Sequence, residues 1–493
     1  MTNLTEAEAR DENIYPILEK PQTVYKDELL EWEDLGERGL IKRLESIFTV
    51  RFKFWGLEDD QLSTIRGTIH PESTVRVEPA LATSTTKKAI KPDATIIKIL
   101  DYKQEQLARS LGSGHRLFSG VAGSGKTLIL LSRAKVLASG VFNQRVVILC
   151  FNITLAAYLR SLIEQENNSL YIERITVLHF HEWAKSIMGG LPNPRNYENE
   201  DDYDEVVGDR LLAELEKTPT QEKWDAVLVD EGHTFQPNWF KCCAAALKDT
   251  ENGDLLIVSD KSQSLYKRRK FTWKSLGIKA QGRVRKLNRN YRNTEEILSA
   301  AWNLVKFLPV VEEDEDEAFP LVEPTSALRH GKQPTLHICD NRLIEAKEAI
   351  AKIQKLVSEG YQPQHIAIIY RYLGRCEAEA FSHLTQQLEE LNLGCYWVNQ
   401  DKKNYSNNHP GIRLITTKSA LGLEFKAVII LWVQQFGVGD EAEAKRELYV
   451  SMTRAQDILH LVGSGQFSVL EELEKSNFFE CVNGENLNYQ YYA

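Results

Sequence analysis

The pattern of apolar and polar positions changes at about residue 96. From there on, short runs rich in Val, Ile and Leu alternate with longer segments whose apolar residues recur at helical spacing. The runs predict strands over 116–119, 145–150, 225–230 and 254–259. The longer segments predict helices over 127–138, 154–164 and 294–306. Strands that are apolar at almost every position are typical of parallel sheets covered on both faces, so an α/β architecture is expected.

A second series of alternating elements follows the acidic run at 312–317. It predicts strands over 335–339, 366–370, 413–416, 427–431 and 458–462. Helices are expected near 343–359 and 378–391. The chain contains no internal repeat that we can identify. Two doubly wound parallel sheets in tandem are therefore expected, with the acidic run as a solvated loop between them.

Residues 1–95 differ from the rest and predict a small, mainly helical region. Helical periodicity is mixed over 28–46, and the Thr-, Ser-, Ala- and Lys-rich stretch at 77–95 predicts a linker. No chemical motif is recognisable in this region. The expected organisation is an N-terminal region over 1–95, an α/β domain over 96–280, a second over 281–465 and a C-terminal tail over 466–493.

Composition narrows the class of protein. A chain of 493 residues exceeds one ordinary domain, and 42% hydrophobic residues suit a globular protein. No apolar run could cross a bilayer and the polar N-terminus is unlike a signal peptide, so we expect a cytoplasmic protein with no membrane partner. The net charge of −10 restricts any nucleic-acid surface to a local patch. The seven cysteines include no Cys-x-x-Cys pair, which argues against a zinc site.

The clearest chemical signal is Gly-Val-Ala-Gly-Ser-Gly-Lys-Thr at 120–127, between an expected strand and an expected helix. This arrangement is typical of a loop that holds the phosphates of a nucleoside triphosphate. The small residues Gly120, Gly123, Ser124 and Gly125 would let backbone N–H groups converge on phosphate oxygens. Lys126 would add a positive charge at the β- and γ-phosphates, and Thr127 would offer a hydroxyl to Mg²⁺. The alternative is an ordinary glycine-rich turn.

A pair of carboxylates, Asp230 and Glu231, ends the apolar strand about a hundred residues later. Asp230 is expected to hold Mg²⁺ directly or through water, and Glu231 to polarise the attacking water. A solvated strand end is the alternative, and the upstream loop favours the catalytic interpretation.

Eight segments then recur in the order of a known family. They are Leu-Asp-Tyr-Lys-Gln at 100–104, Cys-Phe-Asn at 150–152 with Leu-Ala at 155–156, Val-Leu-His-Phe-His at 177–181, Val-Asp-Glu-Gly-His at 229–233, Val-Ser-Asp-Lys-Ser-Gln-Ser-Leu-Tyr at 258–266, Leu-Asn-Arg-Asn-Tyr-Arg-Asn-Thr at 287–294, Ile-Thr-Thr-Lys-Ser-Ala-Leu-Gly-Leu-Glu-Phe at 415–425 and Leu-Tyr-Val-Ser-Met-Thr-Arg-Ala at 448–455. Together they resemble superfamily 1 DNA helicases of the UvrD/Rep/PcrA type. In its compact form the chain resembles the motor of nuclease-related-domain helicases without the nuclease domain.

The resemblance implies two tandem RecA-like P-loop domains with ATP and Mg²⁺ between them. Gln104 would read adenine, Tyr291 would stack on it and Glu424 would hold the ribose. Gln263 would sense the γ-phosphate. Arg292 and Arg454 would act as arginine fingers, since hydrolysis between two sheets needs groups from both.

The resemblance also implies contacts to single-stranded nucleic acid. The residues in the matching positions are Phe151, Asn152, His181, Tyr266, Arg268, Thr416 and Lys418. Several positions depart from the family: His233 replaces Gln, Arg268 an aromatic residue, Lys418 a His and Leu421 a Lys. The basic cluster at 267–270, with Phe271 and Trp273 beside it, is expected either to contact nucleic acid or to be a solvated loop.

The expected activity is ATP-dependent translocation on single-stranded DNA, 3′ to 5′ by resemblance, with short-duplex unwinding in repair, recombination or defence. The inserts of larger relatives look reduced, which disfavours processive unwinding. Two alternatives stay open. One is a nucleotide-gated regulatory subunit of a separate nuclease or another protein partner, and the other is a motor that acts on RNA.

Overall fold

The computed structural model describes residues 5–11, 23–32, 36–47, 111–139, 142–165, 172–260, 271–308, 324 and 329–483. Contacts between Cα atoms divide the chain into two units, Met1–Ile99 and Leu100–Ala493. Among the described residues, no helix is long and apolar enough to cross a membrane.

The N-terminal unit contains three described helices, α1 (Glu6–Asp11), α2 (Lys26–Glu31) and α3 (Gly36–Ile47). Val24, Trp32 and Leu40 form a small apolar cluster in this unit. Arg43 pairs with Glu28, which ties α3 to α2. The expected linker at 77–95 lies outside the described residues.

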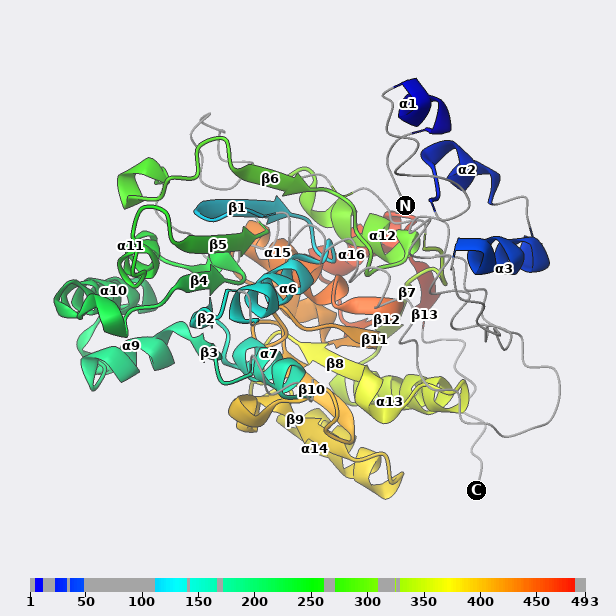
Figure 1. Cartoon of the computed structure of the whole chain (residues 1–493). Helices are drawn as coiled ribbons and strands as arrows, with labels where there is room; N and C mark the ends of the chain where they lie inside the picture. Colours follow the sequence, from blue (N-terminus) through cyan, green and yellow to red (C-terminus); the bar gives the residue numbers. More distant parts are fainter. Residues whose placement is uncertain are drawn as a thin grey trace. The chain divides into compact units, whose positions relative to one another are not determined.

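The first sheet of the larger unit has six strands in the order β3-β2-β4-β5-β1-β6, all parallel (Figure 1). The strands are β1 (His115–Gly120), β2 (Val146–Cys150), β3 (Ile175–His179), β4 (Ala226–Val229), β5 (Asp254–Ser259) and β6 (Val284–Leu287). The helices of this half are α6 (Lys126–Ala138), α7 (Ile153–Gln165), α9 (Phe180–Met188), α10 (Glu200–Lys217) and α11 (Pro237–Ala245).

Helices cover both faces of the first sheet because its strands are apolar on both sides. Val146 and Ile148 of β2 face a core that also contains Ile129 and Leu130 of α6. The alternate residues of β2 belong to a second core, which includes side chains from α9, α10 and α11. This alternation is that of a strand with successive side chains on opposite faces.

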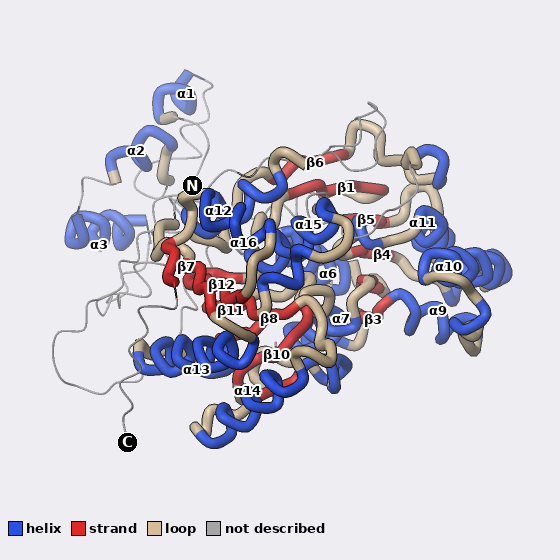
Figure 2. The backbone as a smooth tube through the Cα atoms, turned by 180° about the vertical axis from the view of Figure 1, so that it is seen from behind, coloured by secondary structure: helices blue, strands red, loops and turns tan. Residues whose placement is uncertain are grey.

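The second sheet has seven strands in the order β13-β7-β12-β11-β8-β10-β9, again all parallel (Figure 1). Figure 2 shows β7, β12, β11, β8 and β10 from behind. The strands are β7 (Thr335–Cys339), β8 (Ile366–Tyr370), β9 (Cys395–Trp397), β10 (Ile412–Thr416), β11 (Phe425–Leu431), β12 (Ala455–Ser464) and β13 (Glu480–Asn483). The helices are α12 (Glu295–Val305), α13 (Arg342–Ser358), α14 (Ala378–Glu390), α15 (Glu441–Met452) and α16 (Ser468–Lys475).

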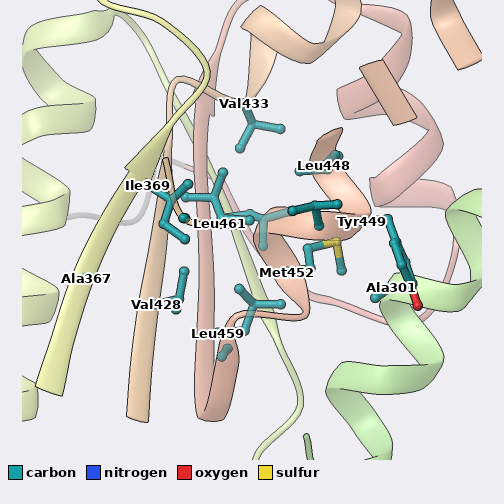
Figure 3. Close-up of a cluster of buried hydrophobic side chains, with 14 of the residues drawn as sticks. Ala301, Ala367, Ile369, Val428, Val433, Leu448, Tyr449, Met452, Leu459 and Leu461 are labelled. Carbon is teal, nitrogen blue, oxygen red and sulfur yellow. The ribbon is translucent and has the colours of Figure 1, made fainter. Parts of the chain in front are cut away.

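This sheet too is covered on both faces. Figure 3 shows side chains of β8, β11 and β12 meeting Leu448, Tyr449 and Met452 of α15, with Ala301 of α12 beside them. The opposite face of the sheet packs on α13 and α14. The prediction of an α/β fold with two parallel sheets is therefore confirmed.

The observed strands that were not expected, β3, β6, β9 and β13, all lie at the edges of the two sheets. β6 has two apolar residues among exposed basic ones, so no apolar run marks it. It lies after residue 280, the expected domain boundary, and pairs with β1 of the first sheet. The expected C-terminal tail contains α16, whose Leu470 and Leu473 enter the core of the second sheet, and the edge strand β13.

Candidate functional site

The glycine-rich loop lies between β1 and α6, at the carboxyl end of the first sheet. Gly123 and Gly125 have φ values of 67° and 81°, in the left-handed region that favours glycine. A Cβ on Gly123 would lie 2.5 Å from Cβ of Arg292, and one on Gly120 would lie 2.8 Å from Oγ of Ser124. The loop therefore needs glycine for its backbone conformation and for its close packing.

Lys126 occupies the first turn of α6 and is only 7% exposed. Its ammonium donates hydrogen bonds to the carbonyl oxygens of Gly120 (2.8 Å) and Val121 (2.7 Å), and lies 3.8 Å from Oδ2 of Asp260. Burial lowers the pKa of Lys126, while Asp260 and the carboxylates of residues 230 and 231 oppose that shift. Hydrogen bonds to two backbone carbonyl oxygens thus hold the Lys126 side chain against the loop, with the Asp260 carboxylate nearby.

Thr127 and Asp230 meet across the end of the sheet. The Thr127 hydroxyl donates to Oδ2 of Asp230 at 2.9 Å, and Oδ1 accepts from the backbone N–H of Glu231 at 2.8 Å. Burial, together with the charge of Glu231, raises the pKa of Asp230. The structure therefore places the sequence-predicted hydroxyl and carboxylate in direct contact.

Glu231 has the backbone conformation of a strained residue. Its φ of 51° is in the left-handed region, which costs a residue with a side chain about 1–2 kcal/mol. Its carboxylate is buried, and Oε2 has no hydrogen-bond partner. Ser124 Oγ in the loop is likewise buried without a partner. Strain and unsatisfied polar atoms in one place are typical of functional sites.

His233 lies beside these carboxylates and is also buried. Its Nδ1 accepts from the backbone N–H of Asp260 at 3.3 Å, so the ring proton must be on Nε2, which has no partner. Nδ1 is 3.4 Å from Oε2 of Glu231. Burial lowers the pKa of His233, which favours the neutral ring. His233 thus has one buried N–H donor, on Nε2, without a partner.

Two arginines reach this site from the segments that lead into the second sheet. Arg292 pairs with Glu424, with 2.7 Å from Nε to Oε2. Arg454 is buried and donates to the carbonyl oxygens of Val450 (3.0 Å) and Leu423 (3.2 Å). Burial and then the charge of Arg292 lower the pKa of Arg454 to about 10. Tyr291, predicted to stack on a base, is half-buried, and its backbone N–H donates to the carbonyl oxygen of Gly123 at 2.9 Å.

The residues predicted to contact nucleic acid are spread over both sheets, and several have protein partners. The Asn152 amide donates to the carbonyl oxygens of Lys418 (2.9 Å), Ser419 (3.2 Å) and Leu421 (3.4 Å), and so links the end of β2 to the loop after β10. The Thr416 hydroxyl contacts Ser419 Oγ at 3.0 Å. The side chain of Lys418 is exposed, which a residue that contacts single-stranded nucleic acid requires.

His181 and Phe151 belong to an aromatic cluster on the face of the first sheet that α9, α10 and α11 cover. His181 stacks on Tyr203 with ring centroids 5.7 Å apart, and its Nε2 is 3.0 Å from Oδ1 of Asp204. Phe151 is half-buried and packs at 5.9 Å from Trp239. Both rings are therefore engaged by protein neighbours.

Four predicted site residues, Gln104, Gln263, Tyr266 and Arg268, lie outside the described residues, as does the cluster at 267–270. Of the two aromatic residues next to that cluster, Trp273 is buried in the core at 5.1 Å from Phe240, and Phe271 packs on the same ring at 5.6 Å. Trp273 is thus not positioned to stack on a base.

Three polar residues at this site were not among those predicted from the sequence. Asp260 follows β5 as Asp230 follows β4, and its position at the carboxyl end of a neighbouring strand was an available signal. Asn290 and Asn293 flank the predicted Tyr291 and Arg292, and nothing in the pattern distinguishes their side chains from those of a turn.

The comparisons with known proteins add little. No family model and no curated protein matches the chain. Among solved structures, the C-terminal domain of a possible DNA helicase from Lactobacillus plantarum WCFS1 is 24% identical. The match covers 39% of this chain and 98% of that domain, with a TM-score of 0.29. A likeness this slight does not indicate a shared function.

Proposed function

We propose that this protein is an ATP hydrolase that moves along single-stranded nucleic acid, with DNA as the favoured strand. The finer proposal is a pair of RecA-like domains of the superfamily 1 helicase type, moving 3′ to 5′ and separating short duplexes in repair, recombination or defence. The observation that carries it is the contact between Thr127 and Asp230, with Lys126 of the same helix turn against the glycine-rich loop. A strand-end carboxylate and a loop hydroxyl are joined although 103 residues separate them.

The residues present fit a nucleotide and a magnesium ion. The loop offers a buried Ser124 hydroxyl that has no partner, and the Lys126 ammonium faces the same loop; both groups can bind phosphate oxygens. Hydroxyl and carboxylate oxygens are ligands that Mg²⁺ accepts, and Thr127 with Asp230 would hold it. When bound, the ion would neutralise charge on the phosphates.

The remaining groups suit hydrolysis. The strained Glu231 holds an unpartnered carboxylate oxygen that can orient and polarise a water. Lys126 can exchange the carbonyl oxygens of Gly120 and Val121 for phosphate oxygens with little movement, since it already faces the loop. Arg292 and Arg454 supply positive charge from the opposite side and would stabilise negative charge on the transferring group.

Movement along a strand would follow from the placement of these groups on two sheets. Arg292 and Arg454 belong to segments that enter the second sheet, so turnover at the first sheet can change how the two sheets contact each other. Lys418 and the Asn152 contact lie at another junction of the same two sheets, where a strand would be gripped and released.

A second candidate is a nucleotide-gated regulatory subunit that switches a nuclease or another protein partner. The observation that favours it is the engagement of two predicted strand contacts by protein. Asn152 binds the 418–421 loop, and His181 binds Asp204 and Tyr203. In that case hydrolysis would occur without dependence on a strand.

The catalytic assignment is tested by steady-state ATP hydrolysis in two variants. Lys126→Ala and Glu231→Gln should each lower kcat by at least ~100-fold at a temperature at which both variants are folded by circular dichroism. Lys185→Ala, which changes an exposed lysine in the same half, is the matched control and should hydrolyse ATP like the wild type. Full turnover in Glu231→Gln would remove the catalytic role proposed for that carboxylate.

A further inference from the structure

The four residues at 290–293 connect the glycine-rich loop to the segment that carries Arg454. They follow β6 of the first sheet and precede α12, which packs on the second sheet. Two of them are asparagines with side chains that are fully buried, Asn290 at 0% exposure and Asn293 at 1%. Their hydrogen bonds join the glycine-rich loop of the first sheet to the segment between α15 and β12 of the second sheet.

The first end of this connection is on the glycine-rich loop. The Asn290 amide donates to the carbonyl oxygen of Ala122 at 2.9 Å. The backbone N–H of Tyr291 donates to the carbonyl oxygen of the adjacent Gly123, also at 2.9 Å. A Cβ added to Gly123 would lie 3.1 Å from the Asn290 side chain, so the two pack in direct contact.

The middle of the connection is a contact between the two asparagine side chains. Nδ2 of Asn290 donates to Oδ1 of Asn293 at 2.7 Å. Oδ1 of Asn290 accepts from the backbone N–H groups of Arg292 and Asn293, both at 2.9 Å. Both N–H donors and the oxygen of the Asn290 amide thus have partners. The backbone of Arg292 is fixed because its N–H donates to that oxygen.

The second end is on the Arg454 segment. Nδ2 of Asn293 donates to the carbonyl oxygen of Thr453 at 3.1 Å and to that of Ala455. These are the two residues on either side of Arg454. The Asn293 amide therefore fixes the peptide that presents Arg454, just as Asn290 fixes the peptide that presents Arg292.

We infer that Asn290 and Asn293 form a positioning strap that holds Arg292 and Arg454 in register with the phosphate-binding loop. The inference rests on the proposed ATP hydrolysis at this site and names two residues that act on it through others. Neither amide has a donor left for a ligand, since the bonds above occupy both donors of each. Their role is to transmit the loop's position to the two arginines.

The strap has a kinetic consequence that simple packing does not. A misplacement of about 1 Å in a catalytic group costs on the order of 100-fold in rate, because transition-state contacts depend on alignment more than ground-state contacts do. Loss of the strap should therefore lower kcat by ~10- to 100-fold while KM for ATP changes by less than about threefold. A variant that merely loosens the fold would lose stability, and would turn over normally wherever it stays folded.

The experiment compares ATP hydrolysis by the full chain and by Asn293→Ala, Asn293→Ser, Asn290→Ala and the double alanine variant. All are assayed at a temperature at which each is folded by circular dichroism. Asn238→Ala is the matched control, because its amide bridges the carbonyl oxygen of Glu205 and the side chain of Asp209 away from the site. If the asparagines act as one strap, Asn293→Ala should have little further effect on kcat in the Asn290→Ala background.

The outcomes separate the strap from the activity on which it rests. No hydrolysis by the wild type means that the proposed function has failed. Hydrolysis by the wild type with unchanged kcat in the folded Asn293 variants overturns the strap alone. A raised KM at constant kcat, or strictly multiplicative effects of the two alanine substitutions, also overturns it. The serine variant keeps the experiment decisive if Asn293→Ala does not fold.

Discussion

Replacing Arg133 by Met removes the cation of a buried ion pair that fixes α6 to the first sheet. Arg133 lies two turns after Lys126, and its Nη2 is 2.6 Å from Oδ1 of Asp254 at the start of β5. The two side chains are 6% and 10% exposed. The guanidinium also donates to the carbonyl oxygens of Leu111 (2.7 Å) and Gly112 (3.2 Å).

The expected loss in Arg133→Met is about 3–5 kcal/mol of unfolding free energy, because a buried carboxylate is left without its partner. The double variant R133M/D254L should recover part of this loss, since no charge then remains in the core. Recovery stays incomplete because the Leu111 and Gly112 carbonyl groups still lack their donor. Lys217→Met, which breaks an exposed pair with Glu214, should change stability by no more than about 0.5 kcal/mol.

The pH dependence of the Arg133→Met loss gives the reasoning its sharpest test. Burial raises the pKa of Asp254 and Arg133 opposes that rise, so the pKa should stand higher in the variant. A carboxyl group with a raised pKa in the folded state does not destabilise the fold at a pH below its ordinary pKa, because it is protonated whether the chain is folded or unfolded. It lowers the free energy of unfolding as the pH rises above that value. The loss, measured by urea unfolding, should therefore shrink from about pH 7.5 to about pH 4.5. An equal loss at both pH values, or a loss under about 1 kcal/mol, would refute the argument.

Three further predictions concern the two sheets. Gly123→Ala should lower kcat/KM for ATP by ~10-fold or more. The added methyl group would clash with Arg292, and the φ of 67° at residue 123 disfavours alanine. Phe180→Ala should cost about 3–5 kcal/mol in urea unfolding, since Phe180 is fully buried and stacks on Trp239 at 3.7 Å; a loss below 1 kcal/mol would count against that packing. Burial lowers the pKa of His460 from 6.5 to about 3, so its contribution to stability is complete above about pH 6.5 and is lost as pH falls. The melting temperature of the wild type should drop between about pH 6.5 and pH 4, and less so in His460→Leu; a flat profile would contradict the assignment.

Most of the buried strands could be predicted from the sequence because most of their side chains are apolar. β2 and β8 are apolar at all or nearly all positions and lie where expected to within a residue. β6 and β13 could not be predicted in the same way, because edge strands bury little and mix polar with apolar residues. Their pairing depends on β1 and β7, which are distant in the sequence.

In the candidate site too, features set by neighbouring residues could be predicted, and contacts between residues far apart in the sequence could not. The turn chemistry of the glycine-rich loop is local, and Lys126 and Thr127 begin the helix that follows it. The partners of Asn152 and Asn293 are carbonyl oxygens 266 and 160 residues away, and backbone carbonyls carry no sequence signal. The sequence could suggest that asparagine binds something at these positions, but not that it binds the other sheet.

Steady-state ATP hydrolysis with and without single-stranded DNA tests the central claim most directly, with RNA and duplex DNA added in parallel reactions. The account predicts strong stimulation by single-stranded DNA, weaker stimulation by RNA, and none of either in Lys126→Ala. Greater stimulation by RNA than by DNA would indicate that the motor acts on RNA. Hydrolysis that is indifferent to every nucleic acid would contradict the motor and would favour the partner-gated regulatory subunit.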